Sequence, residues 1–288
     1  MRKEGNGIQP SETLHLNVPH RSRIATPVSM MASSNTLAQA FKALHNVPGK
    51  PLVLANVYDI ISARTVAELP SCQAIATASF AVARAAGTDD DDLTLADNIA
   101  AVRGVAKVAH ELHKPLSVDI QEGYGDQLEE AINAVLDLGV VGVNIEDVDR
   151  TTQKVYAIDV AVERIKRVLE VARSRGVPDF VVNARCDVLV QGGEIAEVLE
   201  RGKQYLAAGA TTVFVWGGRA RGTRTVEVEQ MVRAFEGKLN VSMKLSPGAH
   251  GVEELARMGV SRISVGPALQ SAAFDLYREV AEGILTVL

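Results

Sequence analysis

Cysteine is scarce in this chain, with only Cys72 and Cys186 among its 288 residues. Two cysteines cannot build a disulfide framework, and such sparing use is typical of a reducing compartment. Aromatic residues are also few, at 4%, and no apolar run approaches the roughly 20 residues that a membrane-spanning helix needs. The net charge of −5 gives no general attraction for nucleic acid or for an anionic membrane. We therefore predict a cytoplasmic protein without a nucleic-acid or membrane partner.

The chain does contain ample aliphatic material for a large core, since 47% of its residues are hydrophobic. Its first part differs from the rest: residues 1–35 are polar, punctuated by glycine and proline, and without sustained periodicity. We predict a flexible N-terminal extension over 1–35 and one catalytic domain over 36–288. The basic residues of the extension, such as Arg2 and Arg21, leave a mitochondrial presequence as the alternative to a cytoplasmic location.

Short apolar, β-branched runs alternate with helical patterns along the rest of the chain. Strands that are apolar throughout and separated by helices indicate a parallel sheet buried on both faces. Eight such units match a closed (β/α)8 barrel of the TIM type. An open doubly wound sheet is the alternative, but it would need a glycine-rich turn after its first strand, where this chain has Asn56-Val-Tyr-Asp59. The predicted strands are Leu52–Asn56, Ala74–Ser79, Leu116–Gln121, Gly142–Asp147, Phe180–Arg185, Thr212–Gly217, Leu239–Lys244 and Arg262–Gly266.

Polar side chains gather at the ends of the third, fourth and fifth predicted strands. Because side chains alternate along a strand, Asp119 and Gln121 share one face, and Glu146 and Arg185 lie on the corresponding faces of their own strands. Catalytic groups of a barrel collect at this end, so we predict that the four converge on one cavity. Carboxylates with room for water suit Mg²⁺, and an arginine can hold a substrate carboxylate through two hydrogen bonds. Structural ion pairs or strand-end caps are the alternative for each residue.

Six segments along the chain form a recognisable series of motifs. They are Asn56-Val-Tyr-Asp-Ile-Ile-Ser-Ala-Arg64, Ala76-Thr-Ala-Ser-Phe-Ala-Val-Ala83, Val118-Asp-Ile-Gln-Glu-Gly-Tyr-Gly125, Gly142-Val-Asn-Ile-Glu-Asp147, Val182-Asn-Ala-Arg-Cys-Asp187 and Ser264-Val-Gly-Pro267. In this order they resemble the isocitrate lyase/phosphoenolpyruvate mutase superfamily, over residues from about 40 to 285. The resemblance implies a (β/α)8 barrel whose last helix swaps onto a neighbour in a homodimer or homotetramer.

The same resemblance implies roles for individual residues. It implies Mg²⁺ or Mn²⁺ bound mainly by Asp119, with Glu146 and Asp90 holding coordinated waters. It makes Arg185 and Asp119 the catalytic candidates. The substrate-binding candidates that it implies are Ser79 and Phe80 through their backbone amides, Arg185, and Asn183; Asn56 and Asp59 are expected to shape the first turn near the site.

The chain departs from the family pattern at two places. Gln121, with Glu122 beside it, stands where the strand-three motif usually has a second aspartate, so these two are candidates only for the outer surroundings of the metal. The loop Val148–Val155 lacks the cysteine of the Lys-Cys-Gly-His stretch of the isocitrate-cleaving lyases; Lys154 is the residue there that could imitate the loop lysine of the mutase branch.

We therefore predict a Mg²⁺-dependent lyase or hydrolase. It would cleave a C–C or P–C bond in a small 2-oxo or 2-hydroxy carboxylate through an enolate-like intermediate. A phosphonopyruvate or phosphoenolpyruvate mutase activity is one alternative. A catalytically degenerate barrel that binds a metabolite is the other.

Overall fold

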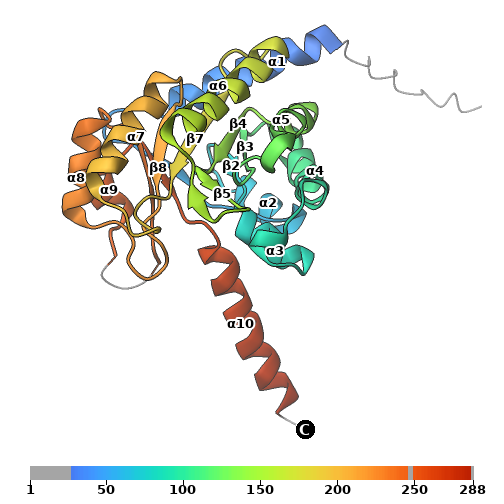
Figure 1. The fold of residues 1–288 in the computed structure, drawn as a ribbon. Helices are drawn as coiled ribbons and strands as arrows, with labels where there is room; N and C mark the ends of the chain where they lie inside the picture. The colour runs from blue at the N-terminus through green and yellow to red at the C-terminus, as the bar shows by residue number, and fades with distance from the viewer. Residues whose placement is uncertain (1–26, 246–248, 287–288) are drawn as a thin grey trace, which may run out of the picture.

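The computed structural model describes residues 27–245 and 249–286 and has a barrel of parallel strands wrapped by helices (Figure 1). The predicted (β/α)8 architecture is confirmed. The eight strands follow the order β1-β10-β9-β8-β7-β4-β3-β2, and a parallel bridge between Val57 and Thr77 closes the ring between β1 and β2. The strands are β1 Leu52–Leu54, β2 Ile75–Ala76, β3 Leu116–Asp119, β4 Gly142–Ile145, β7 Val181–Cys186, β8 Thr212–Val215, β9 Leu239–Ser242 and β10 Arg262–Ser264.

Helices follow the strands and cover the outside of the barrel. They are α2 Ile60–Ala67, α3 Ser79–Ala86, α4 Leu95–Glu111, α5 Leu128–Asp137, α6 Ile158–Ser174, α7 Ile195–Ala207, α8 Thr225–Ala234 and α9 Val252–Met258, with the 3₁₀ turns η1 Asp90–Asp92 and η2 Gly125–Gln127. A small antiparallel hairpin of β5 Val148–Asp149 and β6 Lys154–Val155 follows β4. In the described part of the chain, no helix is long and apolar enough to cross a membrane.

The two faces of the strands carry different chemistry. Outward residues such as Val118, Val143 and Val182 are fully buried against the helices, which supplies the apolar core. The inward residues of the same strands are polar, and buried, including Asp119 and Asn144. A barrel interior is usually filled by branched aliphatic side chains, so this polar interior sets the chain apart.

Two terminal helices lie outside the repeating pattern. Helix α1, Pro27–Leu44, lies at the N-terminal end of the strands, where Phe41 contacts Gly142 at the start of β4. The helix spans residue 35, where the predicted N-terminal extension ends and the predicted catalytic domain begins. Residues 1–26 of that extension lie outside the described residues. The division of the chain into extension and domain stays a prediction. Helix α10, Ala268–Leu285, projects away from the barrel (Figure 1).

Candidate active site

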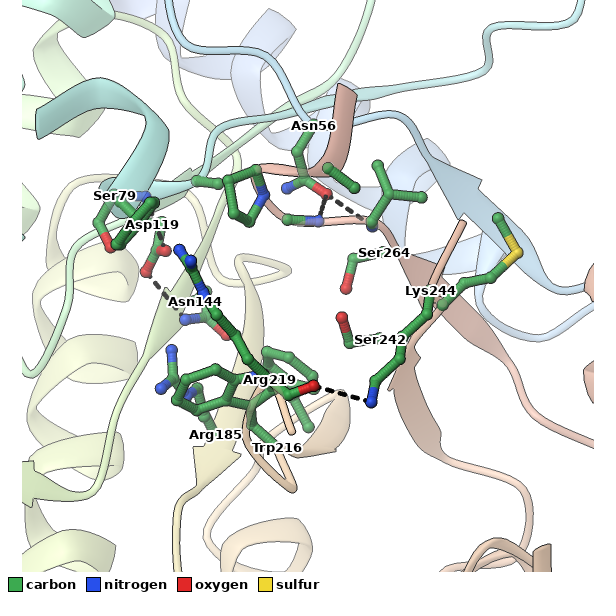
Figure 2. Close-up of a pocket in the computed structure, with 18 of the residues that line it drawn as sticks. Asn56, Ser79, Asp119, Asn144, Arg185, Trp216, Arg219, Ser242, Lys244 and Ser264 are labelled. Atoms are coloured by element: carbon green, nitrogen blue, oxygen red, sulfur yellow. Dashed lines mark hydrogen bonds between the residues drawn. The ribbon is translucent and has the colours of Figure 1, made fainter. Parts of the chain in front are cut away.

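A cavity of about 450 Å³ opens at the C-terminal end of the strands (Figure 2). Four residues predicted for the site line it: Asp119, Asp90, Asn183 and Arg185. Ser79 and Phe80 also line it, from the start of α3. Six of the candidates that lie far apart in the sequence are therefore brought to one cavity, because the carboxyl ends of the parallel strands meet there.

Asp119, the last residue of β3, is held by donors on both carboxylate oxygens (Figure 2). The backbone amide of Ser79 donates to Oδ2 at 2.9 Å, and the side-chain amide of Asn144 donates to Oδ1 at 2.9 Å. The backbone amide of Asp119 donates in turn to the Thr77 hydroxyl, after β2. Contacts with β4, with the start of α3 and with the turn after β2 therefore fix the orientation of Asp119 before any ligand binds.

The hydrogen bonds continue from Asp119 around the barrel wall. Asn183 donates to Oδ1 of Asn144 at 2.8 Å, and the Thr212 hydroxyl donates to Oδ1 of Asn183 at 2.6 Å. The residues are register partners on β3, β4, β7 and β8, so each amide side chain meets the next across one strand spacing. Asn183, a predicted substrate ligand, uses both ends of its amide within this series.

Arg185 lies on β7 and is enclosed by two carboxylates and two rings. Its Nη1 donates to Glu146 at 2.5 Å and its Nε donates to Asp187 at 2.8 Å. The guanidinium carbon lies 4.5 Å from the ring centre of Trp216. Burial lowers the pKa of Arg185, but the charges of Asp187 and Glu146 more than offset this and raise it overall. The cation is therefore permanent and rigidly placed.

Glu146 and Asp90 are linked electrostatically to Asp119. Burial raises the pKa of Glu146 well above its ordinary value; the guanidinium of Arg185 opposes the shift, and the charges of Asp187, Asp119 and Asp90 add to it. Burial also raises the pKa of Asp90, and the charge of Asp119 is the next cause. The other acids of the run, Asp89, Asp91 and Asp92, are exposed, so Asp90 is the member that faces the cavity.

The predicted position of Gln121 in the cavity is wrong. Strand β3 ends at Asp119, and Gln121 has a positive φ of 54°, so the alternation of side chains stops before it. Its side-chain amide donates to the carbonyl oxygen and to Oδ1 of Asp90, at 2.7 and 3.0 Å, and its own oxygen accepts from Arg150. Gln121 thereby fixes Asp90 from outside the cavity.

Glu146 and Glu122 also lie beside the cavity rather than on its wall. Glu146 reaches it through Arg185. Glu122 is buried and accepts from the backbone amide of Gly125. Arg150, on the hairpin after β4, approaches Glu122 at 3.9 Å, whereas Lys154 on the same hairpin is exposed.

The first turn of the barrel behaves as scaffolding. Oδ1 of Asn56 accepts from the backbone amides of Val265 and Gly266, and its Nδ2 donates to the carbonyl of Thr77 (Figure 2). It therefore ties the turn after β1 to the turns after β10 and β2. Asp59 caps α2 by accepting from the amide of Ser62 at 2.7 Å.

The cavity lining also includes residues beyond the predicted site, among them Trp216, Arg219, Lys244 and Arg262. Lys244 donates to the carbonyl of Arg219 at 2.9 Å (Figure 2). The Arg219 guanidinium carbon lies 4.3 Å from the ring centre of Phe80. In the sequence, Arg262 is a polar residue at an inward position of β10, Lys244 follows the end of β9, and Trp216 and Arg219 lie in the Gly-rich loop after β8.

The carboxylates around Asp119 are the donors that Mg²⁺ or Mn²⁺ would use in this cavity. Within residues 27–245 and 249–286, no three His, Cys, Asp or Glu side chains form a compact metal cluster. Mg²⁺ commonly takes one or two carboxylates directly and keeps several waters, so it does not require such a cluster. The mutual repulsion among Asp119, Asp90 and Glu146 is of the kind that a divalent cation relieves. The residues present are therefore compatible with a cation bound directly by Asp119.

Comparisons with known proteins agree on one family. Residues 41–285 match the sequence profile of the family described as phosphoenolpyruvate phosphomutase. The uncharacterized protein Rv1998c of Mycobacterium tuberculosis is 32% identical over 85% of this chain and 88% of its own length. Oxaloacetate decarboxylase 1 of Pseudomonas putida is 27% identical over 84% of this chain and 82% of its own.

A solved structure leads to the same assignment. The crystal structure of 2,3-dimethylmalate lyase superposes with a TM-score of 0.75 and 25% identity, covering 86% of this chain and 87% of that one. That lyase is described as a member of the PEP mutase/isocitrate lyase superfamily. With a profile match that spans nearly the whole barrel, this chain belongs to the phosphoenolpyruvate mutase family within that superfamily.

Proposed function

We propose that this protein is a lyase that breaks a C–C bond in a small 2-oxo or 2-hydroxy carboxylate through an enolate-like intermediate. The observation that carries the proposal is the cavity itself, in which the fixed carboxylate of Asp119 and the permanent cation of Arg185 line one space. Relatives named as 2-methylisocitrate lyase and oxaloacetate decarboxylase support the class of reaction.

Each residue has a task in this proposal. Arg185 binds the substrate carboxylate through Nη2, because its Nε and Nη1 already donate to Asp187 and Glu146. Asp119, with Asp90 and Glu146 around it, holds Mg²⁺ or Mn²⁺, which when bound supplies positive charge where the enolate develops. Phe80 and Trp216 help to exclude water from the reacting bond.

The Ser79 amide is an exception among the residues expected to bind substrate. It already donates to Asp119, so its contribution is to orient that carboxylate. Substrate contact at the start of α3 is then left to the amide of Phe80.

A panel of small carboxylates would test the proposal. We expect release of pyruvate, glyoxylate, acetate or CO₂ from at least one 2-oxo or 2-hydroxy acid, and loss of that activity with EDTA and its recovery with Mg²⁺. Phosphorus NMR with phosphonopyruvate in the same panel detects a mutase reaction instead. Saturable ligand binding without product from any member would replace the proposal with a metabolite-binding barrel.

We also propose that the protein is a homodimer or homotetramer in which α10 packs on a neighbouring copy. The helix projects from the barrel with Leu276, Tyr277, Val280 and Ile284 exposed, Tyr277 by 77%. Val53, on the outer wall of β1, is 38% exposed, although the corresponding residues of the other strands are covered. Exposed apolar surface on both elements is what a swapped helix would bury.

Light scattering after size-exclusion chromatography should therefore give at least twice the mass of one chain. Val280→Glu should shift the protein toward the monomer, because it places a charge in the buried contact. Glu279→Gln, at an exposed polar position next to it, is the control and should leave the mass unchanged. A wild-type protein that is monomeric at all concentrations would contradict the swap.

A further inference from the structure

Arg262, the first residue of β10, is a buried arginine inside the barrel. It alternates with Ile263, which faces the apolar core and is fully buried, and it shares the inward face with Ser264. Only 2% of Arg262 is exposed, yet it lines the cavity. As β10 begins at this residue, the side chain belongs to the N-terminal end of the cavity, which we call its floor.

The guanidinium of Arg262 is not neutralised. In the described part of the chain, no carboxylate lies within ion-pair distance of it, and its Nε and Nη1 have no hydrogen-bond partner. Arg185, by comparison, has two carboxylates in direct contact. Burial lowers the pKa of Arg262 to about 9, and the charge of Asp119 opposes that shift. The group therefore remains a cation at neutral pH.

Other polar groups that line this cavity or flank β10 also lack hydrogen-bond partners. The Ser117 hydroxyl lines the same cavity, is buried, and has no partner within the described residues. Nδ2 of Asn240, the register partner of Arg262 on β9, is likewise unpaired. A buried charge without partners destabilises the folded protein, and unsatisfied buried donors add to that effect.

His45 is a second titratable group close to Arg262. Burial, followed by the charge of Arg262, lowers the pKa of His45 to about 3. Its Nδ1 is 2.9 Å from the carbonyl of Phe41, so the neutral ring donates there and carries no charge. His45 therefore supplies no negative charge to the guanidinium, and its Nε2 accepts no hydrogen bond from the described residues. Asp119 is the acid whose charge acts on Arg262.

We infer that the floor of the cavity is an anion-binding subsite, in which the Arg262 guanidinium and the Ser117 hydroxyl receive a carboxylate or an inorganic oxyanion. Ser117 precedes Asp119 by two residues on β3, so the subsite lies about 7 Å below the carboxylate of the candidate active site. A ligand with two anionic groups can reach both levels of the cavity. For the substrate, this inference rests on the proposed function and adds a second anionic group to it. Binding of a free oxyanion at the floor does not depend on that function.

Thermal unfolding with malonate and with sulfate, at constant ionic strength, tests the subsite. We expect each anion to raise the Tm of the wild-type protein saturably, and Arg262→Met to weaken that binding by about tenfold or more. Without anions, Arg262→Met should have a Tm at least as high as the wild type, because methionine removes an unpaired buried charge. Arg262→Lys keeps the charge and should retain part of the binding. Arg257→Met, at an exposed position on α9, is the control and should behave as the wild type.

The source of the anion follows from competition between the two probes. If sulfate displaces malonate, the subsite takes a carboxylate of the ligand itself; if sulfate and malonate stabilise the protein additively, malonate does not reach the floor, and the subsite takes a free oxyanion. Equal anion affinities in the wild type and in Arg262→Met would overturn the inference. So would a lower Tm of the anion-free variant, or its failure to fold, since the arginine would then be structural. If the carboxylate panel gives no turnover but the anion-induced rise in Tm still depends on Arg262, the lyase proposal is wrong and the anion subsite stands.

Discussion

Asp119→Asn is expected to lower kcat/KM for any substrate found in the carboxylate panel by about 10²-fold or more. The substitution removes the charge that the proposed cation needs. It also places an N–H group where Asp119 now accepts from either the Ser79 amide or the Asn144 side chain, so one donor faces another donor. Mn²⁺ binding, followed by electron paramagnetic resonance, should weaken in parallel, which gives a measurement independent of turnover.

Asp92→Asn is the matched control for Asp119→Asn. It removes one carboxylate from an exposed position in the acidic run beside the cavity, so activity and Mn²⁺ affinity should stay near those of the wild type. A folded Asp119→Asn protein with wild-type turnover would remove Asp119 from the reaction, and with it the basis of the proposed function.

Arg185→Leu is expected to abolish measurable activity and to destabilise the fold. The variant loses the cation proposed to hold the substrate carboxylate, which should cost about 10²-fold or more in kcat/KM. It also leaves Glu146 and Asp187 buried without their counter-charge. Removing one partner of a buried ion pair costs about 3–5 kcal/mol, so the free energy of unfolding should fall by that order in a denaturant titration.

The destabilisation by Arg185→Leu should depend on pH. Burial raises the pKa of both Glu146 and Asp187 in the folded protein, and Arg185 opposes the rise. Without the arginine their folded-state pKa values rise further above the unfolded ones. A carboxyl group with a raised pKa favours the folded state when protonated, and that contribution is lost as pH increases. The stability deficit should therefore be larger at about pH 8 than at about pH 5.

Arg167→Leu provides the comparison for this second experiment. Arg167 makes two hydrogen bonds with Glu129, at 2.6 and 2.7 Å, but both side chains are about two-fifths exposed. Pairs of this kind contribute up to about 1 kcal/mol. If the two leucine variants lost the same stability, with no pH dependence in Arg185→Leu, the buried cluster would not have the energetic role assigned to it.

The direction of a side chain could be predicted from the sequence where a strand is regular along its length. Val118 and Asp119 alternate on a regular strand, so the side that carries the acid could be assigned from neighbours alone. The same rule failed at Gln121, because a backbone with positive φ turns the chain after Asp119 and sends the amide toward Asp90. The predicted strand Ala74–Ser79 is too long, because β2 ends at Ala76 and Ser79 begins helix α3.

The sequence by itself determined the barrel and the placement of Asp119 and Arg185 at its mouth, since apolar strands alternating with helices allow few other arrangements. Only the tertiary structure decided which polar groups find partners. Asn183 and Ser79 are occupied by their neighbours in the wall, whereas Arg262 is left without a counter-charge. Pairing depends on distances between side chains from different strands, and no pattern along one strand contains that information.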